Sequence, residues 1–143
     1  MNLEQFEHYG NGLSESIYIA ALTNDTKYIL KYYQDGFPLD IEDDRSQTLL
    51  HLAARNKAHK SMELLLRLEL NPDMGDKYLE TPLHIATFMG DEEMVELLIQ
   101  FGANVNHKNR NKQTPLHNAS LKGNLQVVKM LLAQGADIYA LDE

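Results

Sequence analysis

The chain has 143 residues, of which 43% are hydrophobic and 24% charged, a composition that fits one globular domain and excludes a low-complexity or wholly disordered chain. Thirteen basic and 21 acidic side chains give a formal net charge of −8, which argues against nucleic acid as a partner because phosphate backbones are bound by clustered lysine and arginine. The absence of cysteine excludes disulfides, thiolate catalysis and zinc–thiolate sites, and it favours a reducing compartment.

The N-terminal residues carry no targeting signal that we can identify. The stretch from Met1 to Glu7 has neither a basic segment nor an apolar run, and nowhere do about 18 apolar residues stand together. We therefore expect a cytoplasmic protein without a membrane span. Separately, we expect the protein to be a monomer. A secreted effector that lacks a cleaved signal would have the same features.

A four-residue motif recurs with a period of 33 residues. Thr-Pro-Leu-His occupies 81–84 and again 114–117, Thr-Leu-Leu-His occupies 48–51, and a weaker copy begins at Glu15. At average residue frequencies, an identical four-residue match at one set spacing has a chance of about 10⁻⁵. We therefore predict four repeats, which cover residues 15–47, 48–80, 81–113 and 114–143.

The residue pattern within each repeat predicts two short helices. In the third repeat Thr81 can cap a helix that starts at Pro82, where the missing N–H does no harm, and Gly90 interrupts the pattern. The apolar residues of 94–98 place a stripe on one face of a second helix, which Gly102 ends. Helices of about eight to ten residues are marginal in water, so a single repeat is not expected to fold without its neighbours.

Together these features resemble the ankyrin repeat family. The resemblance rests on the Thr-Pro-Leu-His-x-Ala motif, the glycine between the helices, the Leu-Leu pair and the Gly-Ala-Asp or Gly-Ala-Asn ending, and it extends over residues 15–143. It implies an all-α solenoid of stacked helix-turn-helix pairs with projecting β-turn loops. It also implies a curved surface that binds other proteins.

The terminal repeats differ from each other. The first lacks the Thr-Pro start and places Lys31 in a column that is apolar in the other repeats, which is typical of a capping repeat with one solvated face. We assign residues 1–14 as an N-terminal capping segment whose apolar residues cover the open end of this repeat. These residues are Leu3, Phe6, Tyr9 and Leu13. The fourth repeat keeps the internal pattern to its end, which fits a fragment of a longer array, or a last face that is tolerated in water or covered by a partner.

The second repeat departs most from the pattern. Lys57 stands where the third and fourth repeats have glycine, and Glu69 stands where the other repeats have the glycine that ends the second helix. If these columns require positive φ, each such residue costs about 1 kcal/mol, and Asn24 in the first repeat costs slightly less. We therefore predict that the second repeat is locally the weakest.

The six histidines raise the question of a metal site. His51, His84 and His117 occupy one column of successive repeats, whereas packed helices lie about 8–10 Å apart. Zinc needs its ligand nitrogens about 2.0–2.1 Å from one ion. We expect these histidines to hydrogen bond to threonine or backbone at the start of a helix, and we expect neither a metal nor another cofactor.

An acidic run precedes the second repeat, at Asp40, Glu42, Asp43 and Asp44, without the residue order of a calcium loop. It indicates a solvated turn, or alternatively a device that steers a basic partner to the N-terminal half, because the first repeat has seven acidic and three basic residues and the second has five of each. No phosphate-binding, nucleophile-elbow or metalloprotease motif occurs. We therefore do not expect an enzyme or a small-molecule substrate.

The resemblance places the partner-binding surface on the turn tips and on the exposed side of each first helix. We predict contacts from Asp44, Arg45, Arg55, Lys77, Tyr78, Phe88, Met89, Arg110, Asn111, Leu121 and Lys122, and the first repeat holds Leu22 and Thr23 in the same helix columns. The apolar members, with cations around them, have the composition of a binding hot spot. The alternative is that Phe88 and Met89 pack against neighbouring helices or stand alone as ordinary exposed residues.

The function that we expect is a non-catalytic protein-binding module, either a scaffold or an adaptor. An inhibitory or regulatory subunit that masks a partner enzyme or toxin is the alternative. An enzyme is a remote third possibility, which would require an unexpected pocket.

Overall fold

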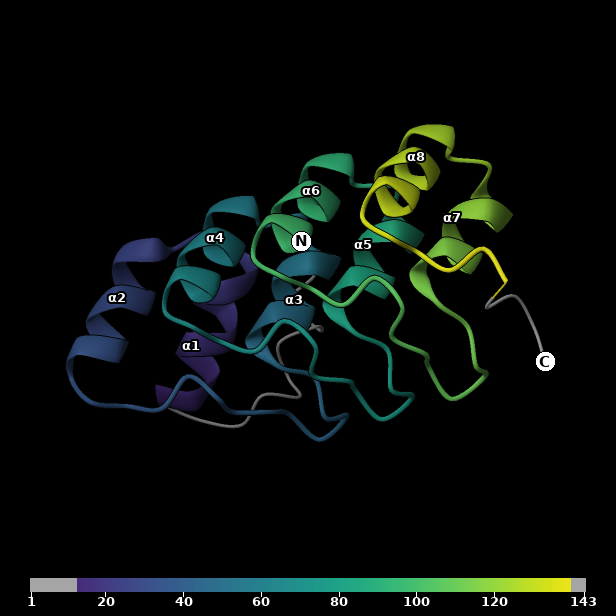
Figure 1. Ribbon diagram of the computed structural model, residues 1–143. Coiled ribbons are helices and arrows are strands. Elements are labelled where there is room, and N and C mark those ends of the chain that lie inside the picture. Colours follow the sequence, from purple (N-terminus) through teal and green to yellow (C-terminus); the bar gives the residue numbers. More distant parts are fainter. Residues whose placement is uncertain (1–12, 140–143) are drawn as a thin grey trace.

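The computed structural model describes residues 13–139, and within this range the predicted all-α fold class is confirmed. The helices are α1 (Leu13–Leu22), α2 (Thr26–Gln34), α3 (Leu49–Arg55), α4 (His59–Arg67), α5 (Pro82–Met89), α6 (Glu92–Gln100), α7 (Pro115–Lys122) and α8 (Leu125–Ala133). They form four consecutive pairs that stand side by side in chain order, with the first helices in one row and the second helices in another (Figure 1). The loops that follow α2, α4 and α6 all project from the same end of the pairs (Figure 1).

The first helices of the middle repeats begin and end as the sequence predicts. Thr81 is the N-cap of α5: its Oγ1 accepts a hydrogen bond from the N–H of His84, and Pro82 is the first helical residue. Gly90 ends α5 with φ of 69°, a left-handed conformation that glycine adopts without a Cβ penalty. Thr114 holds the equivalent place before α7, but its buried Oγ1 makes no hydrogen bond within the described residues.

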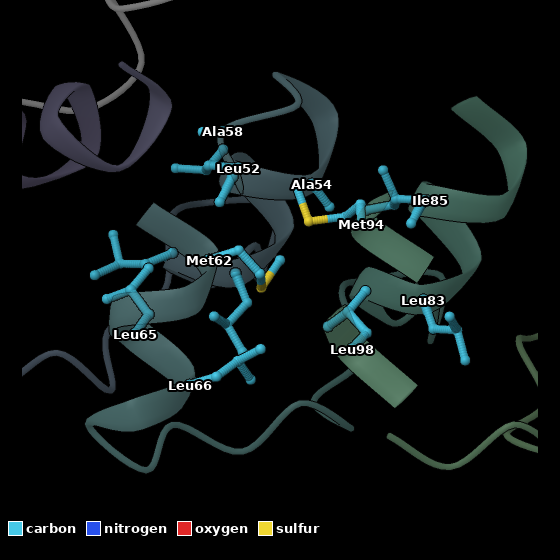
Figure 2. Close-up of a cluster of buried hydrophobic side chains, with 14 of the residues drawn as sticks. Leu52, Ala54, Ala58, Met62, Leu65, Leu66, Leu83, Ile85, Met94 and Leu98 are labelled. Atoms are coloured by element: carbon cyan, nitrogen blue, oxygen red, sulfur yellow. The ribbon is translucent and has the colours of Figure 1, made fainter. Parts of the chain in front are cut away.

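Apolar side chains fill the space between successive pairs. In Figure 2, Met62 and Leu66 of α4 and Met94 and Leu98 of α6 belong to one cluster of buried side chains, which also takes residues from α3 and α5. Burial of each leucine or methionine contributes about 1.5–3 kcal/mol. These contacts between pairs, rather than helix propensity, stabilise the short helices.

Polar side chains also cross between pairs at the helix starts. Ala58 is the N-cap of α4 and offers no side-chain acceptor, but Oδ1 of Asn24 in the preceding pair accepts a hydrogen bond from the N–H of Ser61 at 2.9 Å. Asp91 caps α6 and also accepts a hydrogen bond from Nε2 of His59 in the preceding pair, at 2.8 Å from Oδ2. Each of these caps therefore links two repeats.

The column between the two helices of each pair has positive φ in every repeat. The angle is 69° at Gly90 and 67° at Gly123, and it is 61° at Asn24 and 54° at Lys57. Glu69, in the column after the second helix, also has positive φ, at 70°. Lys57 and Glu69 in the second repeat therefore do adopt positive φ, which was the condition for the predicted weakness of that repeat. The weakness itself stays a prediction.

The predicted capping segment at 1–14 lies outside the described residues, apart from Leu13 and Ser14, which belong to α1. No helix in the described part of the chain is long and apolar enough to cross a membrane.

Replacement of Lys57 by glycine is expected to raise the melting temperature by about 3–4 °C, because relief of one left-handed non-glycine residue is worth about 1 kcal/mol. Thermal unfolding followed by circular dichroism measures the change. Gly123→Ala is the matched control: it lies in the same column, with no atom within 4 Å of the added Cβ, and it should lower the melting temperature by a similar amount. An unchanged or lower melting temperature for Lys57→Gly would refute the predicted weakness.

Candidate protein-binding surface

The three projecting loops share one conformation, and we call them fingers one (43–47), two (76–80) and three (109–113). The first residue of each is aspartate or asparagine, and its Oδ1 accepts hydrogen bonds from the N–H groups two and four residues later, at 2.8–3.0 Å. The N–H of this first residue donates to the carbonyl of the fifth, at 2.9–3.0 Å. This local bonding holds each finger in one shape.

The fourth residue of each finger also has positive φ, at 59° for Ser46, 60° for Leu79 and 62° for Lys112. None of these residues is glycine, so the positive φ of this column could not be predicted from glycine positions. The signal that the sequence offers for this column is the spacing of the three residues by one repeat.

The fingers are bonded to one another in a row. The N–H of Lys77 in finger two donates to the carbonyl of Arg45 in finger one at 3.1 Å, and the N–H of Arg110 in finger three donates to the carbonyl of Tyr78 at 2.9 Å. The three tips therefore lie side by side.

Two histidines connect the first helices to the fingers. Nδ1 of His84 accepts a hydrogen bond from the N–H of Thr81 at 3.1 Å, so the proton lies on Nε2, which donates to the carbonyl of Gln113 in finger three at 2.9 Å. His51 makes the equivalent bonds one repeat earlier, with 2.7 Å to the carbonyl of Glu80. The structural role predicted for these two histidines is confirmed.

Burial of these rings opposes their protonation. Desolvation is the main cause that lowers the pKa of His84 from its usual 6.5 to about 4, and the nearby His107 lowers it further, although the bond to the Gln113 carbonyl partly compensates. Desolvation likewise lowers the pKa of His51. Among the described residues, no group of three histidine, aspartate or glutamate side chains could hold a metal ion.

All the residues that we predicted as partner contacts lie on the solvent-exposed surface. Phe88 is 58% exposed, Leu121 74% and Tyr78 56%, and Met89 is also exposed. Phe88 and Met89 therefore do not pack into the core. In the first repeat Leu22 is buried, whereas Thr23 in the neighbouring helix column is exposed.

Arg55 shows that the helix ends adjoin the fingers. Its Nε donates to Oε1 of Gln47 in finger one at 2.6 Å, and its guanidinium lies 3.8 Å from Oδ2 of Asp76 in finger two. Phe88 and Leu121 occupy the same column in the next two repeats. We call this surface, from the ends of α3, α5 and α7 to the finger tips, the binding strip.

Cations stack on the aromatic rings of the binding strip. Nζ of Lys122, at the end of α7, lies 4.1 Å from the centre of the Phe88 ring at the end of α5, and Nζ of Lys77 lies 5.0 Å from the centre of its neighbour Tyr78. Within the described residues, no ring contact joins Tyr78 to Phe88. The structure thus brings Phe88 and Lys122 together across two repeats and leaves Tyr78 on its finger.

A cavity of about 580 Å³ lies against the first two repeats, and its lining includes Glu42 and Thr48, which flank finger one. Apolar side chains provide most of its lining, among them Phe37, Leu70 and Met74. The lining contains no histidine, serine or lysine, and it therefore offers no pair of a nucleophile and a histidine base.

Comparison with known proteins gives one family match. A family model described as ankyrin repeats (3 copies) matches residues 17–109 and 68–142, two overlapping ranges that together cover most of the chain. A search of curated proteins found no match.

The low pKa of His84 predicts a pH dependence of stability. Because the unfolded chain takes up the proton near pH 6.5 and the folded chain only near pH 4, this stabilisation is complete above pH 6.5 and is lost as the pH falls toward 4, to an extent of about 3 kcal/mol. Urea unfolding between pH 7 and 4 measures the loss, and His84→Gln, which does not titrate, should reduce it. An NMR titration in which the His84 ring protonates near pH 6.5 would contradict this prediction.

Proposed function

The chain belongs to the ankyrin repeat family, whose members are generally non-catalytic protein-interaction modules, and we propose that it binds a protein partner through the binding strip as a scaffold or adaptor. In this proposal the partner contacts repeats two to four. The module acts as a monomer in the cytoplasm, in keeping with the absence of cysteine from the sequence.

The observation that carries the proposal is the exposure of Phe88 and Leu121 in one column of two adjacent helices, with Lys122 stacked on the Phe88 ring. Single exposed apolar residues are ordinary, but neighbouring aromatic and aliphatic side chains beside cations have the composition of an interface centre. Burial of these two side chains against a partner would contribute several kcal/mol, at about 25 cal/mol per Å² of apolar surface.

The fixed main-chain conformation of the fingers supports the same proposal. Association costs free energy for each side chain or loop that has to be ordered. Here the finger main chains are already fixed by their own hydrogen bonds and by bonds between fingers. A partner therefore meets a surface that is largely in its bound shape.

Alanine at Phe88 or Tyr78 tests the proposal. A partner captured with the full chain and then purified should bind each variant about 30-fold more weakly, equivalent to a hot-spot loss of ~2 kcal/mol, in isothermal titration calorimetry. Leu132→Ala is the matched control, because Leu132 is a similarly exposed apolar residue on α8, outside the strip, and its removal should leave affinity unchanged.

Folded Phe88→Ala and Tyr78→Ala variants that keep full affinity would exclude the strip as the binding site. A third protein bridged by the chain would support the scaffold. Loss of the partner's own activity in the complex would instead support an inhibitory subunit.

A further inference from the structure

The charge of the fingers changes sign along the row. Residues 42–47, at finger one, include three acidic side chains and one basic. Residues 108–113, at finger three, include three basic side chains and none that is acidic: Lys108, Arg110 and Lys112. This cationic end belongs to a chain whose net charge is −8, so it does not follow from the overall composition.

Finger three also lacks the carboxylate that begins the other two fingers. Asn109 stands where they have Asp43 and Asp76, and its Oδ1 accepts the same two hydrogen bonds, at 2.9 Å and 3.0 Å. The finger keeps its conformation while one negative charge is absent from its base. The local positive potential is therefore higher than in an aspartate-based finger.

The cations of finger three are available to a ligand. Lys108, Arg110 and Lys112 are exposed, and within residues 13–139 no carboxylate lies in salt-bridge distance of any of them. Arg55 at the other end of the strip differs, because its guanidinium faces Asp76. The Glu80 carboxylate contacts the base of finger three, with 3.4 Å from Nδ2 of Asn109 to its Oε1, but it forms no ion pair with these cations. An acidic group that reaches finger three would thus meet cations that are not already paired.

These cations border the apolar centre of the strip. Lys122 contacts the Phe88 ring, with 4.1 Å from Nζ to the ring centre, and it is next in sequence to Leu121. Finger three is bonded to α5 through the hydrogen bond from Nε2 of His84 to the carbonyl of Gln113, and His84 lies one helical turn before Phe88. The apolar anchor therefore has Lys122 in direct contact and the base of finger three about one helical turn away.

We propose that the strip binds a partner segment in which carboxylate side chains directly follow an apolar anchor. The anchor packs on Phe88 and Leu121, and the carboxylates lie over finger three and Lys122. The acidic finger one repels the acidic end of the segment, which sets its direction along the strip. This inference rests on the proposed function and adds the chemistry and direction of the partner.

Salt screening requires the carboxylates to lie close to the cations. The Debye length is about 8 Å at physiological ionic strength, so charges beyond finger three gain little from it. The same cations would attract phosphate groups, but a nucleic acid that follows the strip would meet the acidic finger one. A protein segment can carry carboxylates at one end only. It can therefore contact the cations of finger three without placing negative charge against finger one.

Selection of a phage-displayed library of random peptides on the full chain tests the inference. Enriched peptides should carry an aromatic or leucine residue next to aspartate or glutamate, and they should lose binding to Phe88→Ala. In fluorescence anisotropy, the triple variant Lys108→Glu, Arg110→Glu, Lys112→Glu should bind these peptides about tenfold more weakly or worse, whereas Asp44→Lys, which removes repulsion at finger one, should bind them more tightly. Circular dichroism establishes that each variant is folded.

Peptides that depend on Phe88 but lack acidic residues, or whose affinity survives the triple charge reversal, would overturn this inference and leave the proposed function intact. A library that yields no peptide dependent on Phe88 would count against both. A single-stranded oligonucleotide that binds the wild type but not the triple variant, and displaces the selected peptides, would overturn the inference in favour of nucleic acid.

Discussion

Every helix that the structure describes depends on apolar contact with the neighbouring pair. The helices are seven to ten residues long, too short to be stable alone in water. One cluster of buried side chains runs through the stack from Ile17 in α1 to Leu131 in α8. Because successive pairs share it, no repeat has a closed core of its own.

This stacking separates positions that fix the fold from positions that are free to vary between repeats. His51 and His84 face inward and tie α3 and α5 to the next finger. The ends of α3, α5 and α7 and the finger tips are not needed for the core, so they can differ between repeats. Arg55, Phe88 and Leu121 share one column yet differ in charge and shape, and the fingers run from acidic to basic.

Features that depend on local chemistry could be predicted from the sequence. Thr81, Pro82 and Gly90 set the limits of α5, and Lys57 adopts the positive φ that its column requires. Features that depend on a side chain from another repeat could not be predicted from the sequence. Neither the capping of α4 by Asn24 nor the burial of Leu22 follows from spacing, because both depend on packing across repeats. The exposure of Phe88 followed from its column, whereas its contact with Lys122 did not.

The most direct test of the account compares one repeat with the whole stack. Residues 81–113 contain the complete motif with α5 and α6, including both the threonine cap and the glycines. We predict that a peptide of this range is largely unfolded by far-ultraviolet circular dichroism in water, while the full chain is helical and unfolds cooperatively. A stable helical peptide would contradict the central claim that neighbouring repeats supply each other's stability.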